Sequence, residues 1–266
     1  MQVVAASEPG SPDKPNEDGV VITASMVAIL DGATVRTDTG CIHGVPWYVE
    51  HVSESLRNHS ELSPTHALAV AIEQTAAAHS DTCDLSHPAT PSAAVAMVCV
   101  NEDSIQYLVL GDVTLAIETT NELRLVVDNR VDGTAIAERA VADGLPAGSQ
   151  AKIAALVRMK RAELAARNVE GGYWIAAADS SAVSHSLTGE IPLVSARRAV
   201  LLTDGAARAV NTFKSYDWPD VFLAVASAGP AALIKKVRIA EESDPTGNRY
   251  PRNKIHDDAT VAAVTF

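Results

Sequence analysis

The sequence contains few cysteines. It has only three, Cys41, Cys83 and Cys99, and no two of them have CxxC spacing. An odd number without that spacing argues against a disulfide framework. Cys41 and His43 also lack a second Cys/His pair that could complete a tetrahedral zinc site. We therefore expect a protein of a reducing compartment and predict a cytoplasmic location.

Long apolar runs are absent as well. No segment of the sequence reaches the roughly 18 consecutive apolar residues of a membrane-spanning helix. The first residues carry no cationic start, and their apolar run is shorter than the core of a signal peptide. We therefore expect no interaction with a membrane.

Positive charge is scarce too. Lys and Arg number 21 against 33 Asp and Glu, which gives a formal net charge of −12. Nucleic-acid backbones are held by clustered cations, so this balance argues against nonspecific nucleic-acid binding. The excess of carboxylates instead suits the binding of cations.

The remaining composition is that of a globular protein. The chain has 266 residues, of which 47% are hydrophobic, enough for one large core. It has no internal repeat or low-complexity tract, and turn residues rather than linkers separate its apolar runs. The sequence predicts a single domain over residues 1–266.

Apolar periodicity predicts strands and helices that occur in runs. The predicted strands cover residues 19–23, 26–30, 93–100, 105–110, 115–118, 123–127, 173–178, 199–203 and 259–266. Those between residues 93 and 127 have the spacing of one meander. The predicted helices cover residues 47–58, 64–78, 132–167 with a break near 144–148, a segment that begins at Asp204, and 218–241. Runs of this kind favour an α+β class with two antiparallel sheets covered by helices.

Acidic residues recur where predicted strands begin or end. The five motifs are Asn16-Glu17-Asp18, Asp31-Gly32, Gly111-Asp112, Asp204-Gly205 and Asp257-Asp258. A carboxylate at a strand end is rigidly held yet open to solvent, and Mg²⁺ and Mn²⁺ prefer such oxygen ligands. Glycine beside the aspartate lets the main chain turn so that its carbonyl faces the same ion. The pattern predicts a site where two cations activate water for attack on a phosphate ester.

The motifs also stand in the order found in the metal-dependent PPM, or type 2C, serine/threonine protein phosphatases, and the sequence resembles that family over nearly its whole length. The resemblance implies a four-layer α-β-β-α sandwich, in which helices flank two antiparallel sheets and metal lies in a cleft at one end. It implies two Mg²⁺ or Mn²⁺ ions, with a third in some members. The implied substrate is a protein that carries phosphoserine or phosphothreonine.

Roles follow from this resemblance by position. It implies that Asp31, Asp204 and Asp257 ligate metal directly, and that these three and Asp18 form the catalytic set. It implies further roles in metal binding, direct or through water, for Asp18, the Gly32 carbonyl, Glu17 and Asp112, the last with the third ion.

The sequence departs from the family around this metal set. Many members have Asp-Gly-His-Gly-Gly, in which the His is a candidate general acid, but here Ala33 follows Gly32. His43 is the alternative from the next loop. The family's phosphate-binding Arg before Glu-Asp is missing as well, which leaves Lys14 or Arg36 as candidates. The basic segment 157–161 lies where the family carries a variable flap.

These departures leave two alternatives open. One is a catalytically weak or inactive relative that binds a phosphorylated partner. The other is a phosphatase for small phosphate esters. The aspartates Asp132 and Asp143 also precede glycines, but they follow no apolar strand and are interpreted as ordinary turn residues.

Overall fold

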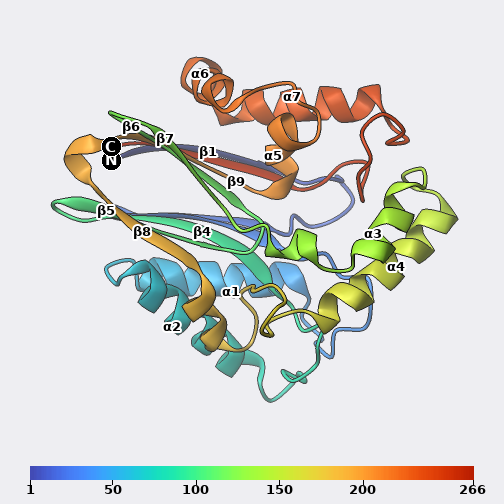
Figure 1. Ribbon diagram of the computed structural model, residues 1–266. Coiled ribbons are helices and arrows are strands. Elements are labelled where there is room, and N and C mark those ends of the chain that lie inside the picture. Colours follow the sequence, from blue (N-terminus) through green and yellow to red (C-terminus); the bar gives the residue numbers. More distant parts are fainter.

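Two five-stranded antiparallel sheets form the centre of the computed structural model, which describes residues 1–266 (Figure 1). The order in the first sheet is β1 (Gln2–Glu8), β10 (Ala259–Thr265), β9 (Ala196–Leu202), β6 (Thr114–Thr119) and β7 (Leu123–Val127). The order in the second is β2 (Asp18–Ile22), β3 (Met26–Gly32), β4 (Ala93–Val100), β5 (Ser104–Leu110) and β8 (Leu187–Pro192).

Helices cover the outer face of each sheet. The second sheet is covered by α1 (Val45–Asn58) and α2 (Pro64–His79), and the first by α5 (Asp204–Asn211), α6 (Trp218–Ala228) and α7 (Pro230–Ser243) (Figure 1). The pair α3 (Ile136–Asp143) and α4 (Gln150–Ala165) lies at one end of the sandwich. Three short 3-10 helices cover Arg130–Gly133, Ser180–His185 and Leu193–Ser195. The predicted four-layer α-β-β-α sandwich is confirmed.

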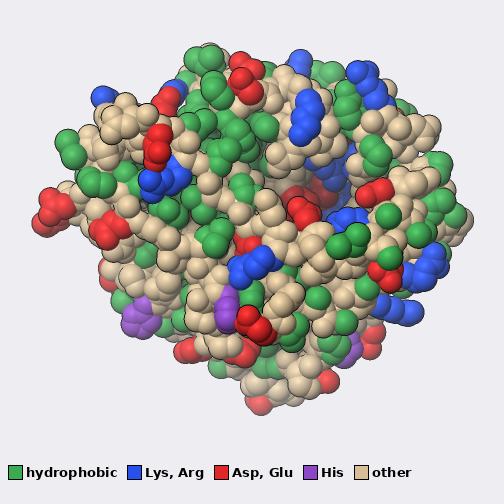
Figure 2. All heavy atoms as spheres, in the orientation of Figure 1, with side chains coloured by type: hydrophobic (Ala, Val, Ile, Leu, Met, Phe, Trp, Pro, Cys, Tyr) green, Lys and Arg blue, Asp and Glu red, His purple; other side chains and the backbone are tan.

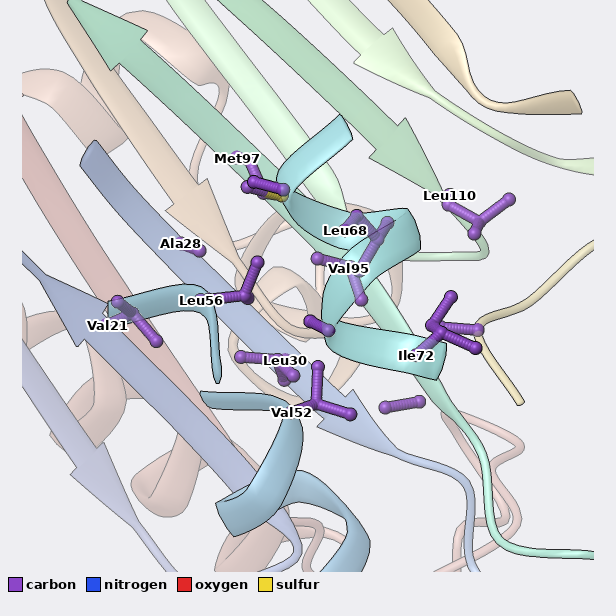
Figure 3. Close-up of a cluster of buried hydrophobic side chains, with 14 of the residues drawn as sticks. Val21, Ala28, Leu30, Val52, Leu56, Leu68, Ile72, Val95, Met97 and Leu110 are labelled. Atoms are coloured by element: carbon purple, nitrogen blue, oxygen red, sulfur yellow. The ribbon is translucent and has the colours of Figure 1, made fainter. Parts of the chain in front are cut away.

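Alternation along β3 shows how the layers are joined. Ala28 and Leu30 belong to the core beneath α1 and α2 (Figure 3), whereas Val27 and Ile29 belong to the core between the two sheets. Successive strand residues point to opposite faces, so an apolar run like this one is buried on both sides. A third core packs the first sheet against α5, α6 and α7. The end of β3 is therefore anchored in two cores at once.

Two predictions about strands are wrong. Residues 173–178 make only isolated bridges, because the side chain of Asn168 takes the ladder positions: it donates to the Ile175 carbonyl at 3.0 Å and accepts from the Ile175 N–H at 2.8 Å. The predicted meander is divided between the sheets. The chain leaves β5 at Leu110 and enters the other sheet as β6, which pairs with β9.

Other boundaries differ in smaller ways. The predicted helix 218–241 is two helices, since Pro230 has no N–H to continue α6 and instead begins α7. Strands β1 and β8 were not predicted, because both are edge strands with polar residues and partial exposure. No helix combines the length and apolarity needed to cross a membrane. The cytoplasmic location stays a prediction.

Leu68 of α2 tests the core beneath the second sheet. The side chain is fully buried against strand residues such as Val95 and Met97 (Figure 3). Replacing it with alanine should lower the free energy of unfolding by about 2–5 kcal/mol, because it leaves a cavity. Urea denaturation measures the change. Leu223→Ala is the matched control, since Leu223 is 63% exposed and its truncation should cost little. Equal losses in the two variants would contradict this packing.

Candidate metal cleft

The sheet topology brings all five acidic motifs to one end of the sandwich. Asp18 and Asp31 are direct neighbours in the β2–β3 ladder, and Asp204 and Asp257 flank the neighbouring strands β9 and β10. Two hydrogen bonds then join the sheets: the Asp204 N–H donates to Asp31 Oδ2 at 3.0 Å, and Thr203 Oγ1 donates to Asp18 Oδ2 at 2.9 Å. Carboxylates separated by almost the whole chain are thus held together.

Glycines allow the close approach of these segments. A Cβ on Gly32 would lie 2.4 Å from both the Glu17 carbonyl oxygen and Val45 Cγ1. A Cβ on Gly205 would lie 2.0 Å from the Asp258 carbonyl oxygen. In both Asp-Gly motifs the glycine is therefore required because backbone from another motif passes directly over it.

A cleft of about 480 Å³ opens at this end, between the sandwich and the α3–α4 pair. Figure 2 shows acidic and basic side chains gathered around the hollow. Of the predicted site residues, those that line it are Asp31, Gly32, Arg36, Asp112, Asp204 and Asp257. Asp18 and Glu17 do not line the cleft but lie directly behind residues that do. Asp18 is the β-ladder partner of Asp31, and Glu17 accepts a hydrogen bond from Thr34 Oγ1 at 3.0 Å. Lys14 is exposed and does not line the cleft.

Burial and mutual repulsion raise the pKa of the clustered carboxyls. Burial raises the pKa of Asp18 to about 8, with help from the charges of Asp204 and Asp258. Burial also raises the pKa of Asp204 to about 7, with help from Asp257, and raises that of Asp31 well above its usual range. Asp204 is open to solvent on the cleft side but enclosed by protein elsewhere. Asp18, Asp31 and Asp204 have no ion-pair partner in the protein, which is the situation a divalent cation relieves.

Asp257 has a different environment. Arg208 Nη2 donates to its Oδ2 at 2.7 Å, and Lys254 Nζ donates to its Oδ1. Burial alone would lower the pKa of Lys254, but the charges of Asp257, Asp204 and Asp31 outweigh it and raise that pKa above its ordinary value. Both carboxylate oxygens of Asp257 are therefore engaged by cationic side chains.

Asp18, Asp31 and Asp204 suit a divalent cation better than Asp257 does. Asp18, Asp31 and Asp204 offer uncompensated oxygens, which suit Mg²⁺ or Mn²⁺. No three Asp, Glu, His or Cys side chains converge on one point as a complete metal-binding group. An ion held by the group Asp18, Asp31 and Asp204 would therefore complete its coordination shell with water and backbone oxygen, as Mg²⁺ commonly does.

The cations around the cleft were mostly missed from sequence. Arg139, Lys160, Arg208, Arg252 and Lys254 line it, and each has a carboxylate partner. Arg36 lines it too but makes no ion pair or hydrogen bond. Lys160 lies in the basic segment 157–161, and Lys254 stands three residues before Asp257, so these two had a sequence signal.

Two further aspartates line the cleft, whereas Asp258 and His43 have other surroundings. Asp132 and Asp143, interpreted as turn residues, both line the cleft. Asp258 holds the first acidic motif, because its carboxylate accepts the Gly10 N–H at 2.7 Å and the Glu17 N–H at 2.8 Å. His43 stacks on Trp47 with a centroid distance of 4.3 Å and does not line the cleft, so it is not positioned as a general acid there.

Neither a protein-family model nor a curated protein sequence matches this chain. Solved structures do. The serine/threonine phosphatase PstP/Ppp of Mycobacterium tuberculosis aligns with a TM-score of 0.60 and 13% identity, over 100% of this chain and 98% of the other. The catalytic domain of PstP in complex with two manganese ions gives 0.57 and 14%, over 98% and 96%. The PPM phosphatase MsPP of Mycobacterium smegmatis, in complex with cacodylate, gives 0.54 and 14%, over 100% and 98%.

These matches agree with the resemblance seen in the acidic motifs. They extend over the whole chain and include both sheets, the flanking helices and the end of the sandwich where the carboxylates meet. The chain has the fold of the PPM-type serine/threonine phosphatases.

Proposed function

We propose that this chain is a divalent-cation-dependent phosphatase that hydrolyses phosphoserine and phosphothreonine in proteins. The observation that carries the proposal is the group Asp18, Asp31 and Asp204, which the sandwich forces together although none of the three forms an ion pair with a protein cation. The fold, shared with serine/threonine phosphatases, supports the same activity.

A divalent cation at these carboxylates would supply a lowered pKa for an attacking water and charge neutralisation on the phosphoryl oxygens. The side chains of the protein orient this centre. The Thr203 hydroxyl fixes the Asp18 carboxylate, and the Asp204 N–H fixes that of Asp31. The guanidinium of Arg36 can donate two parallel hydrogen bonds to phosphate oxygens, because no carboxylate competes for it.

A second candidate function is a catalytically weak relative that binds a phosphorylated partner. The pairing of Asp257 with Arg208 and Lys254 favours it, since this carboxylate is already neutralised. Such a protein would bind a phosphopeptide that it does not turn over. Turnover measured beside binding therefore distinguishes the two functions, and a panel with small phosphate esters tests the substrate class.

Asp204 provides the first test. With Mn²⁺ and a phosphothreonine peptide, Asp204→Asn should lower kcat/KM by roughly a hundredfold or more, because weaker changes around metal ligands already cost 10–100-fold. EDTA should abolish wild-type turnover, and phosphate release is the measurement. Asp81→Asn, at an exposed carboxylate without a hydrogen bond, is the control. Turnover that survives both EDTA and Asp204→Asn would refute the proposed mechanism.

Arg36 provides the second test. Arg36→Ala should raise KM by about 10-fold or more, since a charge-assisted hydrogen bond contributes about 1.5–3 kcal/mol. Arg36→Lys should recover only part of the loss, because a point charge cannot make the bidentate contact. Steady-state kinetics on the phosphopeptide measure both variants, with exposed Arg197→Ala as the control. An unchanged KM in Arg36→Ala would remove Arg36 from phosphate binding.

The raised pKa values predict how metal-free protein responds to pH. A carboxyl whose pKa rises on folding favours the folded state at low pH, and this contribution is lost as the pH rises through the folded pKa. With Asp18 at about 8 and Asp204 at about 7, against an ordinary value of 3.8, EDTA-treated protein should lose stability steadily between about pH 4 and pH 8. Urea denaturation at the two pH values measures the loss. Asp204→Asn should reduce it, and an equal loss in that variant would contradict the assignment.

A further inference from the structure

The Asp257 carboxylate forms ion pairs with two cationic side chains of the protein. Arg208 reaches it from α5, one turn after Asp204, and Lys254 reaches it from the segment before β10. The side chain of Asp257 is only 10% exposed, so these contacts account for both of its oxygens.

The position of Arg208 is fixed by a second buried carboxylate. Its Nη1 donates to Glu241 Oε1 at 2.6 Å, and the Glu241 side chain is fully buried in α7. Glu241 Oε2 in turn accepts from Arg238 at 2.8 Å and is 2.8 Å from His256 Nδ1. Removing Arg208 from Asp257 would therefore leave charges unpaired inside the protein, which costs free energy.

The backbone of Asp257 is held by the same network. Arg238 Nη2 donates to the Asp257 carbonyl at 2.6 Å, so both the main chain and the side chain are positioned by arginines. The network holds three cationic side chains, Arg208, Arg238 and Lys254, against the two carboxylates of Asp257 and Glu241. Of these groups, Arg208, Lys254 and Asp257 line the cleft beside Asp31 and Asp204, so two cations face it with one carboxylate.

We propose that this network takes the place of one of the two cations expected at a dinuclear centre. The cleft then binds a single divalent cation at Asp31 and Asp204, with the Asp18 carboxylate directly behind them, and Asp257 serves as the counter-ion of Arg208 and Lys254 instead of ligating metal. This inference rests on the proposed function and narrows it. It sets the chain apart from the PstP catalytic domain, whose structure is of a complex with two manganese ions.

Lys254 is the residue that decides the number of ions. It is the more exposed of the two partners of Asp257, with 27% of its side chain accessible against 8% for Arg208, and it lines the cleft. Without its ammonium group, one oxygen of Asp257 would face the cleft next to Asp204. That Asp257 oxygen, together with the Asp204 carboxylate shared with the first ion, would then be available to a second hard cation.

The experiment counts Mn²⁺ bound to the metal-stripped full chain, by isothermal titration calorimetry and by electron paramagnetic resonance of free Mn²⁺. Wild type should bind one ion. Lys254→Met and Lys254→Gln should each bind two, while Lys254→Arg should still bind one. Lys235→Met is the control, because Lys235 is exposed on α7 without an ion pair, and it should also bind one. Circular dichroism confirms folding of each variant, and two different neutral replacements guard against a local defect in one.

The outcomes separate this inference from the proposed function. Two ions in wild type with Mn²⁺-dependent turnover would overturn the inference and leave the phosphatase intact. One ion in both neutral variants would also overturn it, since Lys254 would not be what excludes the second. No bound Mn²⁺ and no turnover in wild type would overturn both.

Discussion

Repulsion between carboxylates from two different sheets is the constraint on which the rest of the site depends. Asp18 and Asp31 come from one sheet, and Asp204 follows a strand of the other. Burial raises the pKa of all three, and neighbouring carboxylates raise each of them further. Only a rigid support can keep such groups together. The strands supply it, because β3, β9 and β10 are buried almost along their whole length in the three hydrophobic cores.

The site is divided electrostatically into two parts. In the part formed by Asp18, Asp31 and Asp204, the protein provides hydrogen bonds but no ion pair. In the part around Asp257, it provides the counter-charge as well, through Arg208 and Lys254. A cation added from solution gains most where no protein cation competes, so the first part is where binding should be strongest. On the proposal of a single bound cation, this division gives the acidic motifs different roles although all five are present.

The strands and the acidic residues at their ends could be predicted from sequence, because both are encoded by residues close together in the chain. The apolar runs indicated the strands, and the acidic residues at their ends marked the site, as Asp31 near the end of β3 and Asp204 after β9 show. The compensation of Asp257 was not predicted, because Glu241, which fixes Arg208, lies 33 residues away on another helix. Residues 173–178 show the same limit: their apolar pattern is that of a strand, but a single side chain, that of Asn168, takes the place of a ladder partner.

The distribution of cations around the cleft bears on how a phosphate group would be held. On the α3–α4 side, Arg139 and Lys160 both pair with Glu163, and on the opposite side Arg252 pairs with Asp244. A phosphate dianion would have to compete with those carboxylates for each of these groups. Arg36 has no such competitor, although burial among protein atoms lowers its pKa from the ordinary value. An unpaired guanidinium in that environment gains more from an incoming anion than a paired one. If Arg36 binds phosphate as proposed, the loop that follows β3 supplies the guanidinium that is missing near Glu17.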